Sequence, residues 1–351
     1  MKKTIFTLLM CFLVVATIFI ALLFKENSKI ASQNVEITQK VLSPVISKTL
    51  TPEPVTTFVF AGDMMFDRAV NHYFKKKGLT SIFDNFDKTI TSDKDIRFAN
   101  LEGPISSEAI IDDISPNNLI FNFPPETIEA LKSIRINGVS LANNHTLNAG
   151  RDGLETTKKL LKSADILYSG EQSIFSTDSV LKYDTKVPVS IIAVNLLESP
   201  GQDKVIEKIK EEKTANRFVV VFPHWGNEYA LVHAKSQEEA GHSFVDAGAD
   251  LVVGSHPHVV QDIEIYKDKA IIYSLGNFVF DQTFSKDTQM GLVLTGKIMN
   301  DSLELSFVPT KQVGLKPEMQ KESEKNALLQ RVLPIDGGYE SMGDDTIKLK
   351  R

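Results

Sequence analysis

Cysteine is almost absent from the sequence, and so is any excess of positive charge. Among 351 residues the one cysteine, Cys11, lies inside an apolar N-terminal run. The rest of the chain therefore has no disulfides and no thiolate ligands, so a bound metal would need nitrogen and oxygen donors. The formal net charge is −6, and no dense lysine and arginine run follows the N-terminus. We expect no nucleic-acid partner, because neutralising phosphates requires a basic face.

Charged residues are missing from residues 4–24, which are largely apolar and follow Lys2 and Lys3. A run of this length can cross about 30 Å of hydrocarbon as a helix. The two lysines predict that the N-terminus stays inside and that the rest of the chain is extracytoplasmic. A cleaved signal peptide is the alternative, but its apolar core usually spans about 7–15 residues. We therefore expect an uncleaved signal-anchor at residues 1–24, a single transmembrane helix in the cell membrane.

Large apolar residues are also few in residues 25–55, which contain three prolines. This composition predicts a polar linker. Beyond it, short apolar runs alternate with amphipathic segments as far as His258, and further apolar runs then follow without helices between them. The order predicts an α/β protein with helix-flanked layers and a more antiparallel second half. We expect one domain over residues 56–312 and a polar C-terminal tail over residues 313–351.

The predicted strands are short apolar runs bounded by turn residues. They cover residues 58–61, 96–101, 138–142, 189–195, 218–222, 251–253, 260–266, 270–274, 291–298 and 303–308. The predicted helices have apolar residues at helical spacing. They cover residues 125–134, 154–164 and 237–248.

Five predicted strands end in, or are followed at once by, polar residues of the kinds that bind metals. They are Asp63; Asn100 and Glu102; Asn143, Asn144 and His145; His224; and His256 and His258. In open α/β sheets, ligands bind beyond the carboxyl ends of the strands. Taken singly, Asp63 could be a cap or turn residue, Asn143 and Asn144 turn formers, and His224 a hydrogen-bonded structural residue. Five strands that present such donors at one edge together predict a metal site. The other histidines, at positions 72, 233 and 242, fall in helix-like segments and are interpreted as structural.

Six motifs are similar, in the same order, to those of the CapA family of poly-γ-glutamate capsule biosynthesis proteins. They lie between about Thr57 and Gln282 and read Phe-Ala-Gly-Asp-Met-Met-Phe-Asp-Arg, Asn-Leu-Glu-Gly-Pro, Ala-Asn-Asn-His-Thr-Leu-Asn, His-Trp-Gly-Asn-Glu-Tyr, Gly-Ser-His-Pro-His-Val-Val-Gln and Ser-Leu-Gly-Asn-Phe-Val-Phe-Asp-Gln. The resemblance implies a calcineurin-like metallophosphoesterase fold, which is a layered α-β-β-α sandwich, preceded by an N-terminal transmembrane helix. It also implies an outward-facing, membrane-bound protein.

The resemblance further implies one or two divalent ions, Mn, Fe or Zn, held by Asp, His and Asn side chains. The implied ligands are Asp63, Glu102, Asn144, His224, His256 and His258, with Asn100 as an additional candidate. His145 resembles the non-ligand partner in the Asn-His pair, a candidate general acid. The sequence departs from the phosphoesterase pattern at Met65, where histidine is expected, and in Asn-Leu-Glu, where the pattern has Gly-Asp-x-x-Asp. Because a thioether binds hard ions poorly, one ion position is expected to be weak or missing.

Several neighbouring residues are candidates for contacts with a substrate. They are Arg68, Asn143, Trp225, Glu228, Tyr229 and Asn277. Arg68 could pair with a substrate carboxylate through two hydrogen bonds, or it could form a surface salt bridge. Trp225 could flank the substrate or pack in the core, and Asn277 is expected to shape the pocket wall.

Three functions remain open from the sequence. The first is metal-dependent hydrolysis or transfer on an anionic polymer such as poly-γ-glutamate during its synthesis, export or anchoring, with other membrane subunits as possible partners. The second is hydrolysis of an extracytoplasmic phosphate ester. The third is a non-catalytic polymer-binding subunit of a membrane complex. Met65 favours the third over the second, whereas the retained Asn144 and His145 favour an enzyme.

Overall fold

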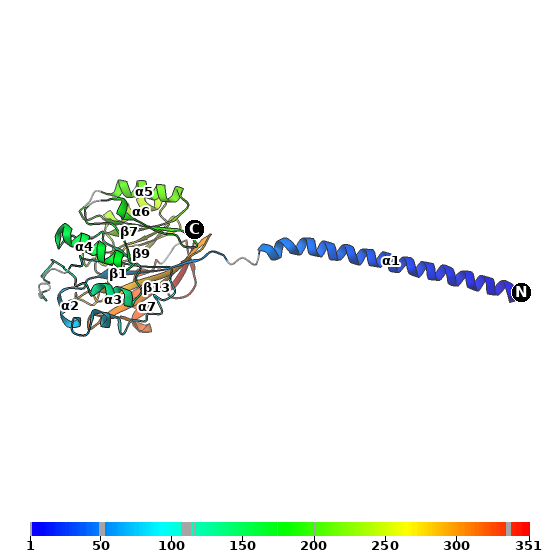
Figure 1. The fold of residues 1–351 in the computed structure, drawn as a ribbon, viewed down its shortest axis with the longest axis horizontal. Coiled ribbons are helices and arrows are strands. Elements are labelled where there is room, and N and C mark those ends of the chain that lie inside the picture. The colour runs from blue at the N-terminus through cyan, green and yellow to red at the C-terminus, as the bar shows by residue number, and fades with distance from the viewer. Residues whose placement is uncertain are drawn as a thin grey trace. The chain divides into compact units, whose positions relative to one another are not determined.

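The computed structural model describes residues 2–48, 53–106, 114–115, 117–173, 175–198, 201–334 and 338–351. Within helices, the side chains of residues 2–12, 37–48, 177, 322 and 323 lie outside this description. The chain divides into two compact units, Met1–Glu53 and Pro54–Arg351. We describe each unit by itself (Figure 1).

The N-terminal unit is one helix, α1 (Lys2–Lys48). It includes most of residues 25–55, for which the sequence predicts a polar linker. Residues 25–43 contain neither glycine nor proline, so nothing in this part of the sequence breaks the helix. No helix in the described part of the chain is long and apolar enough to cross a membrane. The predicted anchor at residues 1–24 begins in a segment whose side chains lie outside the description.

The second unit contains a ten-stranded mixed sheet with the central order β15-β16-β13-β12-β1-β2-β3-β4, while β11 pairs with β1 and β14 with β13. Strands β1 to β4 run parallel, and β12, β13 and β16 continue the sheet in antiparallel pairs. The strands are β1 (Thr56–Met64), β2 (Ile96–Leu101), β3 (Gly138–Ser140), β4 (Leu167–Ser169), β11 (Asn277–Val279), β12 (Met290–Ile298), β13 (Ser302–Val313), β14 (Lys316–Met319), β15 (Glu340–Ser341) and β16 (Thr346–Lys350).

A six-stranded sheet has the order β5-β6-β7-β8-β10-β9. Its strands are β5 (Val180–Tyr183), β6 (Val189–Asn195), β7 (Phe218–His224), β8 (Leu251–Val253), β9 (Ile263–Tyr266) and β10 (Lys269–Ile272). Strands β6, β7, β8 and β10 are parallel, and β5 and β9 close the edges in antiparallel pairs.

The helices of this unit are α2 (Arg68–Phe74), η1 (Leu79–Phe83), α3 (Thr127–Ser133), α4 (Gly150–Ser163), η2 (Thr177–Ser179), α5 (Gln202–Thr214), α6 (Lys235–Ala247) and α7 (Glu322–Val332). Helices α2 to α6 cover the outer faces of the two sheets, whereas α7 packs against the cluster between them. Figure 1 shows α5 and α6 on one side of this unit and α2 and α3 on the other. Three apolar clusters separate the layers: one between the sheets, one under α2 to α4 and one under α5 and α6. The α/β class expected from the sequence is confirmed.

The apolar pattern of β1 explains this layering. Phe58 and Phe60 pack between the sheets, whereas Val59 and Ala61 face the helices. Successive side chains in a strand point to opposite faces. A parallel strand with both faces covered is therefore apolar at every position, as the run Phe58–Ala61 is.

The C-terminal residues differ from the predicted polar tail over residues 313–351. Strand β16 pairs with β13, and its residues Ile347 and Leu349 belong to the cluster between the sheets. Leu328 and Leu329 of α7 join the same cluster. Because β16 alternates apolar and polar residues, one of its faces is buried while the segment as a whole remains polar in composition.

Candidate metal centre

The carboxyl ends of parallel strands from both sheets meet at one edge of the second unit. Strands β1 and β2 bring Asp63 and Glu102 from the larger sheet, and β7 brings His224 from the smaller one. Gly62 permits part of this arrangement, because a Cβ atom there would lie 1.9 Å from the carbonyl oxygen of Gly276. This close approach pairs Asp63 with Asn277 across β1 and β11.

Two buried carboxylates form the centre of the cluster. Asp63 and Glu102 have no exposed surface. Asn100 lies between them, and its Nδ2 donates hydrogen bonds to Asp63 Oδ1 at 2.8 Å and to Glu102 Oε2 at 3.1 Å. Donor atoms of Asp63, Glu102 and His224 all lie within 4.8 Å of one another. In this arrangement Asn100 acts as a hydrogen-bond donor that spaces the two carboxylates.

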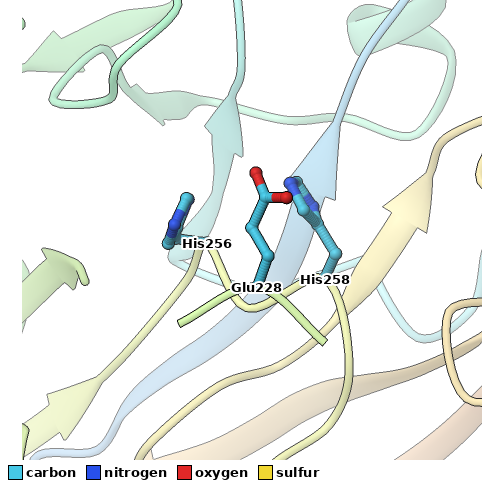
Figure 2. Close-up of side chains that lie close together, drawn as sticks. All are labelled: Glu228, His256 and His258. Carbon is cyan, nitrogen blue, oxygen red and sulfur yellow. The ribbon is translucent and has the colours of Figure 1, made fainter. Parts of the chain in front are cut away.

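The His-Pro-His segment after β8 brings two imidazoles to the same place. His256 and His258 have positive φ angles of 98° and 57°, a conformation that is uncommon for residues other than glycine and is frequent at functional sites. The His256 amide donates to Asp63 Oδ2 at 3.2 Å. Figure 2 shows both imidazoles beside the carboxylate of Glu228, and donor atoms of the three residues lie within 4.8 Å of one another.

His258 joins the two groups of potential ligands. Its Nδ1 lies 3.4 Å from Asp63 Oδ2, and its Nε2 lies 3.4 Å from Glu102 Oε1. Asn277 Oδ1 also contacts Nδ1, at 3.0 Å. Burial alone would lower the pKa of His258, but the negative charges of Glu102 and Asp63 outweigh it and raise this pKa to about 9.

Burial lowers the pKa values of two of the histidines and raises that of Glu102. It lowers the pKa of His224 well below 6.5, helped by the neighbouring His256 and His258. It lowers the pKa of His256 to about 4, again helped by His258. Burial also raises the pKa of Glu102, an effect that His258 opposes and Asp63 reinforces. Neutral His224 and His256 can each offer a lone pair, and two adjacent buried carboxylates are stabilised by a positive charge.

Two buried atoms at this place find no hydrogen-bond partner among the described residues: Glu102 Oε1 and His256 Nδ1. An unsatisfied buried polar atom is costly, and in native proteins it often marks a missing water or ion. The donors are carboxylate oxygens and imidazole nitrogens, which suit Zn, Fe or Mn. The residues therefore fit the divalent ion that the sequence predicts.

Asn144 and His224 complete the predicted ligand set. His224 Nε2 lies 2.9 Å from Asn144 Oδ1, while its Nδ1 lies 3.0 Å from Ser255 Oγ. All the residues predicted as ligands therefore lie in one cluster. They are Asp63, Glu102, Asn144, His224, His256 and His258.

His145, the predicted proton-transfer residue, is held beside the cluster. Its Nδ1 lies 3.0 Å from Asn148 Oδ1, which also accepts a hydrogen bond from the Phe121 amide. Because that oxygen is an acceptor, the Nδ1 atom of His145 carries the proton. The imidazole packs on Phe121 with 4.2 Å between ring centroids. Burial lowers the pKa of His145 below 6.5, so the neutral ring has its lone pair on Nε2.

Three of the residues predicted to contact substrate border the cluster. Glu228 and Tyr229 are exposed, and the Tyr229 amide donates to the Pro257 carbonyl at 2.8 Å, which ties this segment to the two histidines. Glu228 is close enough to be a ligand, a role that the sequence did not indicate. Asn277 is buried, and its Oδ1 contacts His258 Nδ1, the nitrogen that also faces Asp63.

The other three predicted substrate residues are held inside the protein. Trp225 is 2% exposed and its indole donates to the Tyr273 carbonyl, which favours the core alternative. Asn143 is fully buried and bonds Asn100 and the Leu101 carbonyl. Arg68 pairs with Asp281 in the interior, so its salt bridge is not at the surface.

Met65 and the remaining histidines lie outside the cluster. Met65 is fully buried in the apolar layer under α2 to α4. His72 and His242 lie in α2 and α6, whereas His233 precedes α6, which corrects its expected helical position. His233 contacts Asp262 and His242 contacts Glu264, which agrees with structural roles.

Sequence reasoning missed three supporting residues: Ser255, Asn148 and Asp281. Ser255 and Asn148 lie one and three residues from His256 and His145, so their positions within the motifs were available signals. Asp281 lies far along the chain from Arg68, and no local pattern connects the two.

The fold and the cluster define an α/β protein with two helix-flanked sheets and a candidate metal centre at their shared edge. The chain belongs to the family described as bacterial capsule synthesis protein PGA_cap, whose family model matches residues 57–282. This range includes every residue of the candidate centre, and the resemblance to CapA proteins is confirmed.

Relatives extend the match beyond that range. The capsule biosynthesis protein CapA of Bacillus anthracis is 30% identical over 318 residues, covering 84% of this chain and 77% of that protein. The PGA biosynthesis protein CapA of Bacillus subtilis strain 168 is 28% identical over 306 residues, covering 82% and 80%. A probable polyglutamine synthesis accessory protein of Mycobacterium tuberculosis is 29% identical over 214 residues, covering 53% and 56%.

Proposed function

We propose that this chain is a membrane-anchored, extracytoplasmic protein of poly-γ-glutamate or related surface-polymer biosynthesis that uses a divalent-metal centre for hydrolysis or transfer. The single observation that carries the proposal is the convergence of two buried carboxylates and three buried histidines in one cluster. Similarity to capsule and PGA biosynthesis proteins supports the substrate class.

The cluster offers two neighbouring sets of ligands for one or two ions. Asp63, Glu102 and His224 form one set, and Glu228, His256 and His258 form the other. Asn144 adjoins the first set through His224. A divalent ion bound there supplies a Lewis acid, which polarises a carbonyl or phosphoryl oxygen and lowers the pKa of water. The layered α-β-β-α arrangement agrees with the metallophosphoesterase-like fold that the resemblance implies.

The protein's own side chains supply positioning and proton transfer. Neutral His145 has its proton on Nδ1, directed at Asn148, and can accept a proton at Nε2 and then return it to a leaving group. Asn277 Oδ1 contacts His258 Nδ1, the nitrogen that also faces Asp63, and so helps to hold the ring in place. Tyr229 is 42% exposed beside His258 and offers an aromatic surface to a substrate.

An anionic polymer needs compensation for its charge, because the chain itself is acidic with a net charge of −6. The arginine nearest the centre, Arg68, is already neutralised by Asp281. A metal ion that contacts a substrate oxygen would provide the missing positive charge. The proposed anchor at residues 1–24 would keep this centre at the outer surface of the membrane, where the polymer is handled.

The test uses the full chain in detergent, with poly-γ-glutamate, a γ-glutamyl dipeptide and bis(p-nitrophenyl) phosphate as substrates. His256→Ala removes a proposed ligand, and His242→Ala is the matched control, because His242 lies in α6 beside Glu264. We expect bound Mn, Fe or Zn by elemental analysis, and turnover of γ-glutamyl amides that only His256→Ala abolishes.

The other outcomes discriminate between the alternatives. Turnover of the phosphodiester alone would identify a phosphoesterase. Bound metal and bound polymer without turnover would identify a binding subunit of a membrane complex. Less than a tenth of an equivalent of metal after reconstitution would exclude both enzymes. For the anchor, carbonate extraction of cell membranes should leave the chain in the pellet, and release into the supernatant would refute membrane insertion.

A further inference from the structure

Two aromatic rings flank the candidate centre, and one buried arginine packs against both. Phe121 packs on His145, and Phe280 packs on His258 with 4.8 Å between ring centroids. The guanidinium carbon of Arg68 lies 5.0 Å from the Phe121 centroid and 5.7 Å from that of Phe280. The two phenyl rings also meet edge to face at 6.1 Å. A single cation therefore contacts both rings that hold the imidazoles.

Asp281 fixes the orientation of this guanidinium. Arg68 Nη2 donates to Asp281 Oδ1 and Arg68 Nε donates to Asp281 Oδ2 at 3.1 Å. The side chains are 2% and 4% exposed. The Ala69 amide donates to the same carboxylate at 3.2 Å, and Arg68 Nη1 donates to the Asn118 carbonyl at 3.0 Å. A bidentate pair sets the plane of the guanidinium as well as its position.

These contacts join three separate segments that surround the centre. Arg68 begins α2, Asn118 and Phe121 precede α3, and Phe280 and Asp281 follow β11. The Arg68 backbone has a positive φ of 47°, a strained conformation that persists where surrounding contacts impose it. The side-chain contacts of Arg68 therefore connect all three segments.

We propose that Arg68 is a positioning residue, which sets the orientation of His145 and His258 through Phe121 and Phe280. This role replaces the substrate contact predicted from the sequence, because Asp281 already occupies the guanidinium. The proposal rests on the proposed function for the roles of the two histidines, but it requires no knowledge of the substrate.

The test compares Arg68→Lys and Asp281→Asn in the full chain in detergent, labelled with ¹⁵N-histidine. Lysine keeps the positive charge but lacks the two parallel N–H donors and the flat guanidinium that stacks on aromatic rings. Arg217→Lys is the matched control, since Arg217 also pairs with an aspartate, Asp184, but on the smaller sheet. The measurements are the imidazole NMR signals of the metal-free protein, the Kd for Mn²⁺ by calorimetry and the thermal unfolding temperature.

We expect both variants to shift the signals of His145 and His258 and to raise the Kd for Mn²⁺ about tenfold, the low end of the usual effect of losing a supporting contact. A double variant with both Arg68→Lys and Asp281→Asn should show the same signal shifts and the same Kd as each single variant, because each substitution breaks the same contact. Arg217→Lys should alter only the unfolding temperature.

Unchanged imidazole signals in Arg68→Lys and Asp281→Asn, with a loss of stability like that of Arg217→Lys, would overturn the proposal. If Arg68→Lys fails to fold, the isosteric Asp281→Asn variant decides. Failure of wild type to bind Mn²⁺ would overturn the proposed function instead, and the metal-free NMR signals would still decide the role of Arg68.

Discussion

Replacing Asn100 by aspartate puts a third carboxylate between two that are already buried. Asn100 Nδ2 donates to Asp63 Oδ1 at 2.8 Å and to Glu102 Oε2 at 3.1 Å. The Asn100→Asp variant loses both donors and gains a like charge at the same distances. We expect the metal-free protein to be strongly destabilised, and a divalent cation to reverse much of this loss.

The magnitude follows from the two contacts. A hydrogen bond to a charged group contributes about 1.5–3 kcal/mol, so two lost bonds cost at least about 3 kcal/mol. Protonation limits the added repulsion, because keeping an aspartate of ordinary pKa protonated at pH 7 costs about 4 kcal/mol. The free energy of unfolding should therefore fall by about 3–10 kcal/mol. At about 2 °C per kcal/mol for a unit of this size, the unfolding temperature drops by about 6–20 °C.

The assay is thermal unfolding of the full chain in detergent, with EDTA or with excess Mn²⁺. A cation at 100 times its Kd stabilises a protein by about 2.7 kcal/mol, and the additional carboxylate should increase this gain in the variant. Asn143→Asp is the matched control, because Asn143 bonds Asn100 and the Leu101 carbonyl instead of the two carboxylates. Its loss of stability should persist in Mn²⁺.

The pH adds an internal check. The new carboxyl has a raised pKa in the folded protein, so a fall in pH from 7 to 5 protonates it and removes the repulsion between the carboxylates. The loss of unfolding free energy in Asn100→Asp should therefore be smaller at pH 5 than at pH 7. An equal deficit with EDTA and with Mn²⁺ would refute the reasoning, since it would mean that the three oxygen-bearing side chains do not face a common cation.

Other residues of the unit give further predictions. Because the pKa of His258 is raised to about 9, its positive charge stabilises the metal-free protein fully below about pH 6.5, and this stabilisation is lost by about pH 9. Between these pH values the free energy of unfolding of wild type should fall by about 3 kcal/mol relative to that of His258→Gln. Urea unfolding in EDTA measures this difference. A parallel pH dependence of the two proteins would contradict the pairing with Glu102 and Asp63. His145→Gln should lower kcat by about 10²–10⁴-fold without changing the Kd for Mn²⁺, since the role proposed for this residue is proton transfer and not ligation; weaker Mn²⁺ binding would argue for ligation. Trp225→Ala should cost about 3–5 kcal/mol of stability as a core truncation and leave substrate KM unchanged, so a raised KM at normal stability would restore a substrate role.

The clustering of the predicted ligands could be foreseen from the sequence, because the direction of each strand decides where its end lies. Asp63, Glu102 and His224 each stand at or directly after the end of a run with two buried faces, and parallel strands bring such ends to one edge. The His-Pro-His segment follows β8 in the same way. Short-range rules were sufficient here, since strand direction alone decides which side of the sheet these residues reach.

The burial of Trp225 follows from the way adjacent residues in an extended chain face opposite sides. His224 ends β7 facing the cluster, so the next side chain points to the outer layer, where Trp225 packs beside Phe244 and Tyr273. The alternation was a usable signal. For Arg68, by contrast, no signal existed, because Asp281 is 213 residues away and only the folded chain brings the two together.

The sequence by itself determined the α/β class, the edge at which the donors gather and the chemical kinds of those donors, because hydrophobic periodicity and strand ends are local properties. Only the tertiary structure decided which donors lie close enough together to share a cation and which side chains support them. Glu228 moved from a substrate contact to a potential ligand, and Arg68 from the surface to a buried pair with Asp281. Contacts between distant segments depend on how two sheets and their loops pack, and this packing sets the distances, the burial and the pKa values of the centre.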